Sequence, residues 1–452
     1  MRVLLVSANT ATTPYPVYPL GMMTVAAAVR EAGHALSLFD FLQHKAPLAA
    51  LEEAVRQENP EVVGISVRNI DNVNALHEQR YIDTVRDIVA AIRACSQARI
   101  VLGGSGFSIL PERILETAAA DYGIVGEGEE QFVQFLARAQ AGEWPATGTL
   151  LRAPRRLPGP RLQAAFYERD LLRRYLDGGT VASLQSKRGC PLQCVYCSYP
   201  ALEGACIRAR PPSQVVDDIE RLVGEHGVKF LFFTDSVFND DGGHYLELLA
   251  EMQTRKVAVS WSAFLKPSGL TPDSVRLMQE TGLTAAELGS DAACDATLRG
   301  LRKSFTFADV VRSNDLFAER KIAVAHYFMF GGPAETPATV REGIENMRRL
   351  NCSAAFVFMG IRLLPDTELL DIARRQGVIA PMQDLLEPAY YLAPGLSRPW
   401  LEETLTAGFR DMHHVVFPPD AMDDKLRLLH KLGYAGSLWE LLAPQPRPGP
   451  TP

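Results

Sequence analysis

The sequence predicts an α/β protein made of two successive units in which strands and helices alternate. Short apolar runs that fit buried strands recur between stretches of helical periodicity along most of the 452 residues. The alternation stops in a stretch rich in proline and arginine, residues 141–180, which we interpret as a linker because proline breaks regular elements. Alternating strands and helices favour parallel pairing, and the length favours two or three domains at about 150 residues each.

The first unit, residues 1–140, fits a doubly wound parallel sheet with helices on both faces. Its predicted strands are residues 3–6, 36–39, 62–67, 100–102 and 122–125. Its predicted helices are residues 21–30, 48–57, 82–95, 111–119 and 129–137. The fourth of these helices opens with Pro111, and proline is favoured at a helix start.

Ligands of doubly wound sheets bind beyond the carboxyl ends of the strands, where four loops of this unit carry glycine or polar residues. Glycine lets a ligand approach the backbone closely, and the polar residues 68–72 either hold a ligand or cap the loop locally. No G-x-G-x-x-G motif follows the first strand, so a dinucleotide is a poor fit. The candidate binding residues are Asn9, Arg68, Asn69, Asp71, Gly103, Gly104, Ser105, Gly126 and Glu127.

The second unit, residues 181–395, contains about six strand–helix units, and in closed or partial barrels the chemistry lies at the carboxyl ends of the strands. Its predicted strands are residues 181–185, 230–233, 257–261, 285–288, 323–329 and 354–358. Its predicted helices are residues 214–225, 245–253, 272–280, 306–319 and 339–350. Residues 396–452 are predicted to be mainly helical, over 401–416 and 421–442, with a disordered proline-rich tail at 444–452.

Three cysteines lie close together at the start of the second unit: Cys190, Cys194 and Cys197, spaced C-x3-C-x2-C. This spacing fits three corners of a [4Fe–4S] cluster and leaves one iron open. A structural zinc site usually needs four ligands, and the nearest fourth thiol is Cys206, so a zinc knuckle or free buried thiols are the alternative interpretation. The other cysteines are scattered, which indicates a reducing compartment and no disulfide scaffold.

Composition excludes some classes of partner. The formal net charge of −7 argues against nucleic acid or an anionic membrane surface, both of which favour a basic face. The amino terminus lacks the pattern of a signal peptide, and no apolar run has the length of a membrane span. We therefore expect a cytoplasmic protein with no membrane or nucleic-acid partner.

The cysteine spacing, with Tyr196 before the last cysteine, resembles the radical S-adenosylmethionine (SAM) superfamily. Four later stretches also resemble family motifs: residues 232–238, 287–291, 330–336 and 362–367. The resemblance implies a partial (β/α)6 barrel in which Tyr196 lies near the adenine of SAM, Asp235 faces its methionine, and Ser290 and Asp291 contact its ribose. The family usually has Glu where Asp291 stands, and Arg362 of the last motif is a candidate carboxylate clamp.

The first unit resembles the Rossmann-like cobalamin-binding domain that precedes many radical SAM domains. The resemblance rests on residues 19–21, 26–34, 103–106, 111–112 and 121–129. One departure is that the sequence lacks the D-x-H-x-x-G motif whose histidine binds cobalt from below. We therefore expect cobalamin to bind without a histidine on cobalt, or the domain to have kept its fold and lost its ligand.

Together these resemblances imply a cobalamin-dependent radical SAM methyltransferase, with a [4Fe–4S] cluster, SAM and cobalamin as cofactors. In that family the cluster donates an electron to SAM, a 5′-deoxyadenosyl radical takes hydrogen from the substrate, and cobalamin supplies a methyl group to an unactivated carbon, or less often to phosphorus. The implied partners are a small-molecule substrate and an electron donor such as flavodoxin or ferredoxin. The alternatives are a non-methylating radical rearrangement, cyclisation or ring contraction, and a non-catalytic iron–sulfur or sensing protein.

Overall fold

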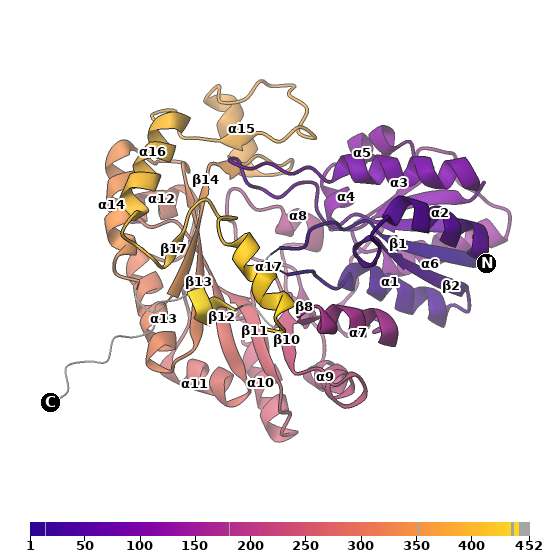
Figure 1. Cartoon of the computed structure of the whole chain (residues 1–452), viewed down its shortest axis with the longest axis horizontal. Coiled ribbons are helices and arrows are strands. Elements are labelled where there is room, and N and C mark those ends of the chain that lie inside the picture. Colours follow the sequence, from indigo (N-terminus) through magenta and orange to yellow (C-terminus); the bar gives the residue numbers. More distant parts are fainter. Residues whose placement is uncertain (14, 180, 351–352, 435–437, 443–452) are drawn as a thin grey trace.

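The structure is a computed structural model, and it describes every residue except 14, 180, 351–352, 435–437 and 443–452. Two parallel sheets lie next to each other, each with its own set of helices (Figure 1). The first sheet is built from the amino-terminal part of the chain, and the second from the part that follows α7 (Arg169–Asp177).

The first sheet has six strands in the order β2-β1-β3-β4-β5-β6, and each pairing is parallel. Its strands are β1 (Arg2–Ser7), β2 (Ala35–Asp40), β3 (Val62–Ser66), β4 (Arg99–Gly103), β5 (Tyr122–Val125) and β6 (Thr149–Arg152). The associated helices are α1 (Leu20–Glu31), η1 (Phe41–Gln43), α2 (Pro47–Glu58), α3 (Ile82–Cys95), α4 (Ser105–Ile109), α5 (Pro111–Ala118) and α6 (Glu129–Gln140).

Helices cover both faces of this sheet because successive strand residues point to opposite sides. In β1, Val3 and Leu5 pack in one cluster with residues of α1 and α6. Leu4 and Val6 pack in another with residues of α2, α3 and α5. The predicted doubly wound sheet is confirmed.

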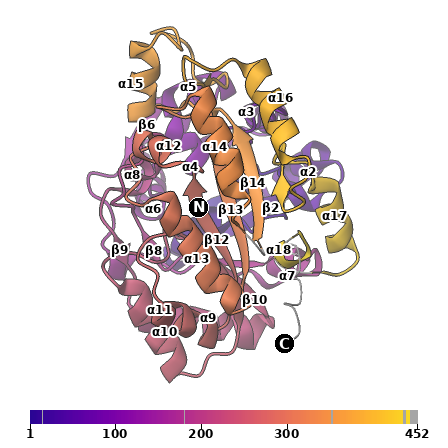
Figure 2. The same ribbon diagram turned by 90° about the vertical axis from the view of Figure 1, so that its left-hand side faces the viewer.

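The second sheet has seven strands in the order β17-β14-β13-β12-β11-β10-β7, and its pairings are also parallel. Its strands are β7 (Ala182–Leu184), β10 (Phe230–Phe233), β11 (Ser260–Leu265), β12 (Leu283–Asp291), β13 (Ala323–Phe330), β14 (Ser353–Met359) and β17 (Val415–Val416). Its helices are α9 (Pro212–His226), α10 (His244–Thr254), α11 (Pro272–Glu280), α12 (Asp295–Gly300), α13 (Phe307–Glu319) and α14 (Pro337–Met347). Helices α13 and α14 lie on the outer face of the sheet, which confirms the predicted partial barrel (Figure 2).

Several segments differ from the sequence prediction. The predicted linker, residues 141–180, contains η2 (Gly159–Arg161), helix α7 and strand β6, and β6 extends the first sheet beyond β5. The prediction of a linker rested on the prolines of this segment and overlooked the short apolar pair Leu150 and Leu151, which lies between Pro145 and Pro154 and forms part of β6. The predicted helix 401–416 is wrong in its second half: α16 (Arg398–Phe409) ends early and Val415–Val416 pair with β14, as suits β-branched residues.

After α16 the chain forms two short helices, α17 (Asp423–Lys431) and α18 (Trp439–Leu442), in place of the single predicted helix 421–442. The predicted disordered tail, residues 444–452, lies outside the described residues. None of the helices within the described ranges combines the length and apolarity that a membrane crossing needs. The domain boundaries stay a prediction.

The carboxyl ends of the two sheets face each other, and buried ion pairs join them. Asp71, which follows β3, pairs with Arg362 of β15 (Ile361–Arg362) at 2.8 Å, and their side chains are 2% and 3% exposed. Glu127 and Glu129 after β5 both pair with Arg188, which follows β7. Because both architectures place ligands at these edges, the two units share one space between them.

Replacing Arg362 by Met is expected to lower the apparent free energy of unfolding by about 3–5 kcal/mol, because Asp71 would be left as an unpaired buried charge. Urea denaturation followed by circular dichroism measures the change. The control is Arg86→Ala, since Arg86 pairs with Asp83 on the surface with both side chains 53% exposed, and its expected cost is at most about 1 kcal/mol. Equal costs for the two variants would show that the buried pair does not hold the units together.

Candidate functional site

The three clustered cysteines lie on a loop that is fixed at both ends. The loop follows β8 (Lys187–Arg188) and leads into α8 (Tyr199–Glu203), and β8 pairs with β9 (Arg208–Ala209). Lys187 is buried and donates to Asp240 and to the Phe238 carbonyl, each at 2.6 Å. Gly189 has φ +93°, and a Cβ there would lie 2.0 Å from the Cys206 carbonyl oxygen, so the turn requires glycine.

The thiols of this loop differ from the fourth nearby thiol in burial. Cys190 is buried, Cys194 and Cys197 are half-buried, and Cys206 is exposed. Burial raises the pKa of Cys190 and raises the pKa of Cys197 to about 12, and the neighbouring thiols add to both shifts. Metal binding would therefore release protons from this loop.

The donor set fits an iron–sulfur cluster. No three His, Cys, Asp or Glu side chains in the described ranges converge on a position that suits a single metal ion. A [4Fe–4S] cluster instead spreads its thiolate ligands over separate irons, so three thiols on one loop suit it. The exposed Cys206 lies outside this group, which disfavours a four-thiol zinc site.

Three polar side chains lie together beside Cys194. Tyr196 donates its hydroxyl to Asp291 at 2.8 Å, and Lys303 donates to the Cys194 sulfur at 3.0 Å and to the Tyr196 hydroxyl at 3.2 Å. Lys303 also forms an ion pair with Asp291, which ends β12 with φ +60°. The structure thus brings together two predicted SAM residues, Tyr196 and Asp291, with a lysine that no sequence motif indicated.

Ser290, the neighbour of Asp291, points to the opposite side of the strand. Its hydroxyl lies 2.7 Å from Nδ1 of His326, whose Nε2 lies 3.2 Å from Asn314 of α13. All three side chains are fully buried, and burial lowers the pKa of His326 to about 3. The predicted ribose contact of Ser290 stays a prediction, but this hydroxyl already has a partner on the helical side of the barrel.

Two other predicted SAM residues already have structural partners. Asp235 accepts hydrogen bonds from the backbone of Ser186 at 2.8 Å and of Lys187 at 3.2 Å, and from the Ser186 hydroxyl, so it holds the start of the cysteine loop. Besides Asp71, Arg362 binds two backbone carbonyls, those of Leu363 at 2.7 Å and Leu385 at 2.8 Å. Contacts of Asp235 and Arg362 with SAM remain predictions, and their observed bonds are with protein groups.

The loops of the first unit contain both packed and open positions. A Cβ on Gly104 would lie 2.5 Å from the Val67 carbonyl oxygen, so this glycine serves close packing of two loops. Gly126 has φ +82° and open space around its missing Cβ, and a Cβ on Gly103 would meet only the Ile124 oxygen at 3.7 Å. These two open glycines suit the approach of a large planar ligand.

The predicted polar residues of these loops have different partners. The Glu127 carboxylate binds Arg208 and the Leu157 amide, and although burial alone would raise its pKa, these partners hold the pKa below its usual value. Asn9 and Asp71 accept from backbone amides two residues on, which is the local capping alternative. Ser105 donates to the Arg68 carbonyl at 2.9 Å, and reorienting the Asn69 amide lets that side chain bond to Arg68 as well.

The Arg68 side chain is exposed but lies in a crowded environment. Burial by surrounding protein lowers its pKa, and the nearby tyrosines that oppose this shift include Tyr199 of α8 and Tyr15. This combination fits a side chain that faces the space between the units rather than open solvent. Tyr199, although 43% exposed, is in an equally crowded environment: burial raises its pKa to about 12.

The inner face of the barrel is aromatic with one buried carboxyl group. Phe264 is 39% exposed, and its ring centre lies 6.4 Å from that of Tyr327, which stacks on Phe356 at 5.6 Å. Glu287 accepts a hydrogen bond from Tyr327 at 2.8 Å and one from Trp439 of α18 at 3.4 Å. Burial raises the pKa of Glu287 to about 7, so its carboxyl group titrates near neutral pH.

The histidines of the first unit have partners of their own. His34 lies 3.3 Å from the terminal amino group, His44 stacks on Phe39, and His77 lies 2.7 Å from Asp420. A cobalamin site without a histidine ligand stays a prediction.

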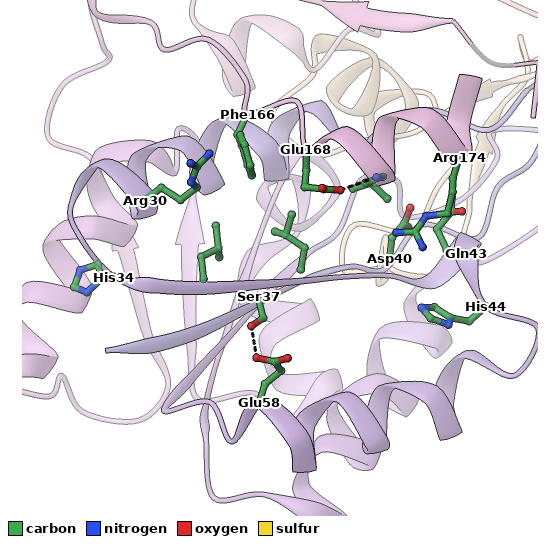
Figure 3. Close-up of a pocket in the computed structure, with 13 residues that line it drawn as sticks. Arg30, His34, Ser37, Asp40, Gln43, His44, Glu58, Phe166, Glu168 and Arg174 are labelled. Carbon is green, nitrogen blue, oxygen red and sulfur yellow. Dashed lines mark hydrogen bonds between the residues drawn. The ribbon is translucent and has the colours of Figure 1, made fainter. Parts of the chain in front are cut away.

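A pocket of about 670 Å³ lies at a different place, beside the edge strand β2 (Figure 3). Its lining includes Arg30, Ser37, Asp40 and Arg174 but none of the predicted site residues. Ser37 binds Glu58, and Asp40 accepts from Tyr175 at 2.6 Å. We therefore place the candidate site between the two sheets and not in this recess.

Each of the two units matches a known protein family. The family model of the B12 binding domain matches residues 6–136, and that of the Radical SAM superfamily matches residues 184–347. The tryptophan 2-C-methyltransferase of Streptomyces laurentii is 26% identical, covering 80% of this chain and 73% of that protein. The anaerobic magnesium-protoporphyrin IX monomethyl ester cyclase of Cereibacter sphaeroides is 26% identical, covering 72% of this chain and 55% of that protein.

A solved structure is also similar. The radical S-adenosylmethionine methyltransferase TsrM from Kitasatospora setae, with cobalamin and a [4Fe–4S] cluster bound, is 25% identical and superposes with a TM-score of 0.84. The match covers 97% of each chain, so both units and their arrangement are shared.

Replacing Cys190, Cys194 or Cys197 by Ala is expected to abolish cluster assembly, because each thiolate would hold one iron. Anaerobic reconstitution followed by iron and sulfide analysis and absorption near the cluster bands measures the loss. The matched control is Cys206→Ala, which should retain a full cluster since this thiol is exposed and outside the group. Loss of the cluster from the Cys206 variant would mean that the site has four closed ligands.

The free energy of unfolding of the wild type should fall as the pH rises, partly because of Glu287. In the Glu287→Gln variant this fall is expected to be smaller. The folded-state pKa is raised from 4.5 to about 7, so the carboxyl group's stabilising effect is complete below pH 4.5 and is lost as the pH rises through about 7. Urea unfolding measures the free energy of unfolding at pH 5 and at pH 8. The decrease between these two pH values should be larger for the wild type than for the variant, by at most about 3 kcal/mol. Glu116→Gln, with a 71% exposed side chain, is the control, and equal pH slopes for all three proteins would contradict the prediction.

Proposed function

The chain belongs to the radical SAM enzymes that carry an amino-terminal B12 binding domain, and we propose that it transfers a methyl group to a carbon or phosphorus atom of a small-molecule substrate. The observation that carries this proposal is the contact between the two carboxyl edges. Helix α4, which begins directly after Gly103 and Gly104, contacts α8, which begins directly after Cys197 and Ser198. The loops that suit cobalamin and the cluster are therefore neighbours across one shared space.

In this proposal Cys190, Cys194 and Cys197 hold the cluster, and Gly103, Gly126 and Arg68 face the cobalamin. The bound groups supply electron transfer and methyl transfer, which side chains alone do not provide. The protein holds these groups in fixed positions relative to each other and closes the space with the ion pairs of Arg188 and Arg362. Closure matters because water and stray hydrogen donors compete with the substrate for reactive intermediates.

Tyr196 and Asp291, which Lys303 joins to Cys194, are the proposed SAM residues. The Asp291 carboxylate accepts the hydroxyl of Tyr196, and in the bound state it would accept ribose hydroxyls in the same way. The Tyr196 ring is anchored by Lys303, whose amino group lies 5.2 Å from the ring centre. The ring is therefore held in a fixed orientation for contact with a flat base.

The barrel interior is the proposed substrate space. Phe264, Tyr327 and the half-buried Phe358 offer apolar and aromatic surface near the carboxyl ends of three strands of the second sheet, β11, β13 and β14. Glu287 holds the Tyr327 hydroxyl, so that the hydroxyl oxygen is free to accept a hydrogen bond from the substrate. We further propose that a low-potential protein of the flavodoxin or ferredoxin type supplies the electrons.

The test follows an isotope label from SAM into product. A strain that lacks the protein should accumulate an unmethylated precursor, and purified reconstituted protein with SAM labelled as CD3 should convert that precursor to a product carrying one CD3 group. Omitting cobalamin, or using the Cys190→Ala variant, should abolish the conversion because each removes one proposed cofactor. Mass spectrometry of the precursor and product measures the transfer.

Conversion without incorporation of the label would contradict the methyl-transfer proposal. It would favour a radical rearrangement or cyclisation, an outcome given weight by the similarity to a cyclase whose match covers 72% of this chain. The Cys206→Ala protein, which should keep its cluster, is the matched control for the effects of removing a cysteine.

A further inference from the structure

Lys303 is placed against the cysteine loop by its own backbone. It follows α12, and its amide bonds to the Leu298 carbonyl at 2.9 Å. The adjacent Leu301 carbonyl accepts the amide of Val195, in the middle of the cysteine loop, at 3.2 Å. The turn that carries Lys303 and the loop that carries Cys194 are therefore joined by backbone bonds and hold a fixed separation.

The Lys303 ammonium group is largely shielded from solvent and contacts three partners. Its side chain is 8% exposed, and it contacts the Cys194 sulfur at 3.0 Å, the Tyr196 hydroxyl and the Asp291 carboxylate. The Asp291 carboxylate, its ion-pair partner, stabilises the charged form of the ammonium group. The lysine therefore presents a positive charge to one of the three clustered thiols.

We propose that Lys303 sets the reduction potential of the cluster by donating a charged hydrogen bond to the Cys194 sulfur, and that Asp291 limits this effect by neutralising the lysine. The inference rests on the proposed cluster ligands but not on the proposed methyl transfer. Hydrogen bonds to cluster sulfurs and nearby charge are two of the factors that set iron–sulfur potentials. Lys303 is a positioning and tuning residue in this role, since it acts through a ligand of the cluster.

The direction of the effect follows from charge. Reduction adds one negative charge to the cluster, and a positive donor at Cys194 stabilises that added charge, so Lys303 raises the potential and makes reduction easier. Low local dielectric strengthens the effect because the group is buried. Asp291 carries the opposite charge at the same place and therefore lowers the potential.

The same geometry couples the potential to the SAM site. Asp291 is the proposed acceptor for ribose hydroxyls, and hydrogen bonds from the ribose would spread its negative charge away from Lys303. Less of the lysine charge would then be neutralised, and the potential would rise when the nucleoside binds. The cluster would thus become easier to reduce when SAM is in place, which limits wasteful reduction in its absence.

The test is a redox titration of the reconstituted protein followed by electron paramagnetic resonance of the reduced cluster. Lys303→Gln and Lys303→Met should each make the reduction potential of the cluster more negative. We expect the equilibrium constant for reduction to fall about tenfold, which corresponds to a shift of about 59 mV for one electron. Asp291→Asn should shift it in the positive direction. S-adenosylhomocysteine, added as a probe, should raise the potential of the wild type and leave that of Asp291→Asn unchanged.

Controls separate tuning from structural damage. Lys229→Gln, an exposed lysine next to the amino end of β10, should leave the potential unchanged. Iron and sulfide content must match the wild type before potentials are compared, and if the lysine variants lose the cluster, the Asp291→Asn shift decides the question. Unchanged potentials in variants with full clusters would overturn the proposal. If the variants show these shifts but the wild-type protein transfers no methyl group, only the proposed function would be contradicted.

Discussion

The arrangement of this protein depends on buried charge pairing across the interface between its two sheets. Each sheet ends in polar loops, and these loops meet through Asp71 with Arg362 and through Glu127 and Glu129 with Arg188. A buried charge without its partner is costly, so these pairs constrain how the two units can be placed relative to each other. Apolar packing contributes as well, because one core cluster contains residues of both sheets.

The same constraint explains why several candidate binding residues have protein partners. Arg362 and Glu127 look like ligand-binding groups in the sequence, because Arg362 lies in a stretch that resembles a family motif and Glu127 lies in a glycine-containing loop after a strand. In the folded chain Arg362 pairs with Asp71, and Glu127 pairs with Arg188 and Arg208. Their other partners are backbone groups. Residues left open after this pairing, such as Arg68 and Gly126, are better candidates for contact with a ligand.

Around the cysteine loop, buried polar groups form two layers. Asp235 and Lys187 hold the backbone at the start of the loop, while Lys303 and Asp291 lie against the thiol and tyrosine side chains. The first layer fixes the position of the loop, and the second places charged groups next to the Cys194 thiol and the Tyr196 hydroxyl. The exposed Cys206 takes part in neither set of contacts, although its carbonyl oxygen leaves no room for a side chain at residue 189.

The sequence by itself determined both α/β units, nearly all of the strands of the two parallel sheets, and the cysteine loop, because strand and helix periodicity and ligand spacing are local properties of the chain. It missed β6 and misjudged Val415–Val416, since both are short edge strands whose pairing depends on a distant neighbour. Lys303 lies more than a hundred residues from Cys194, and Asp71 lies still farther from Arg362. Only the tertiary structure decided these pairs, because no local pattern tells a charged side chain which distant group will share its buried surroundings.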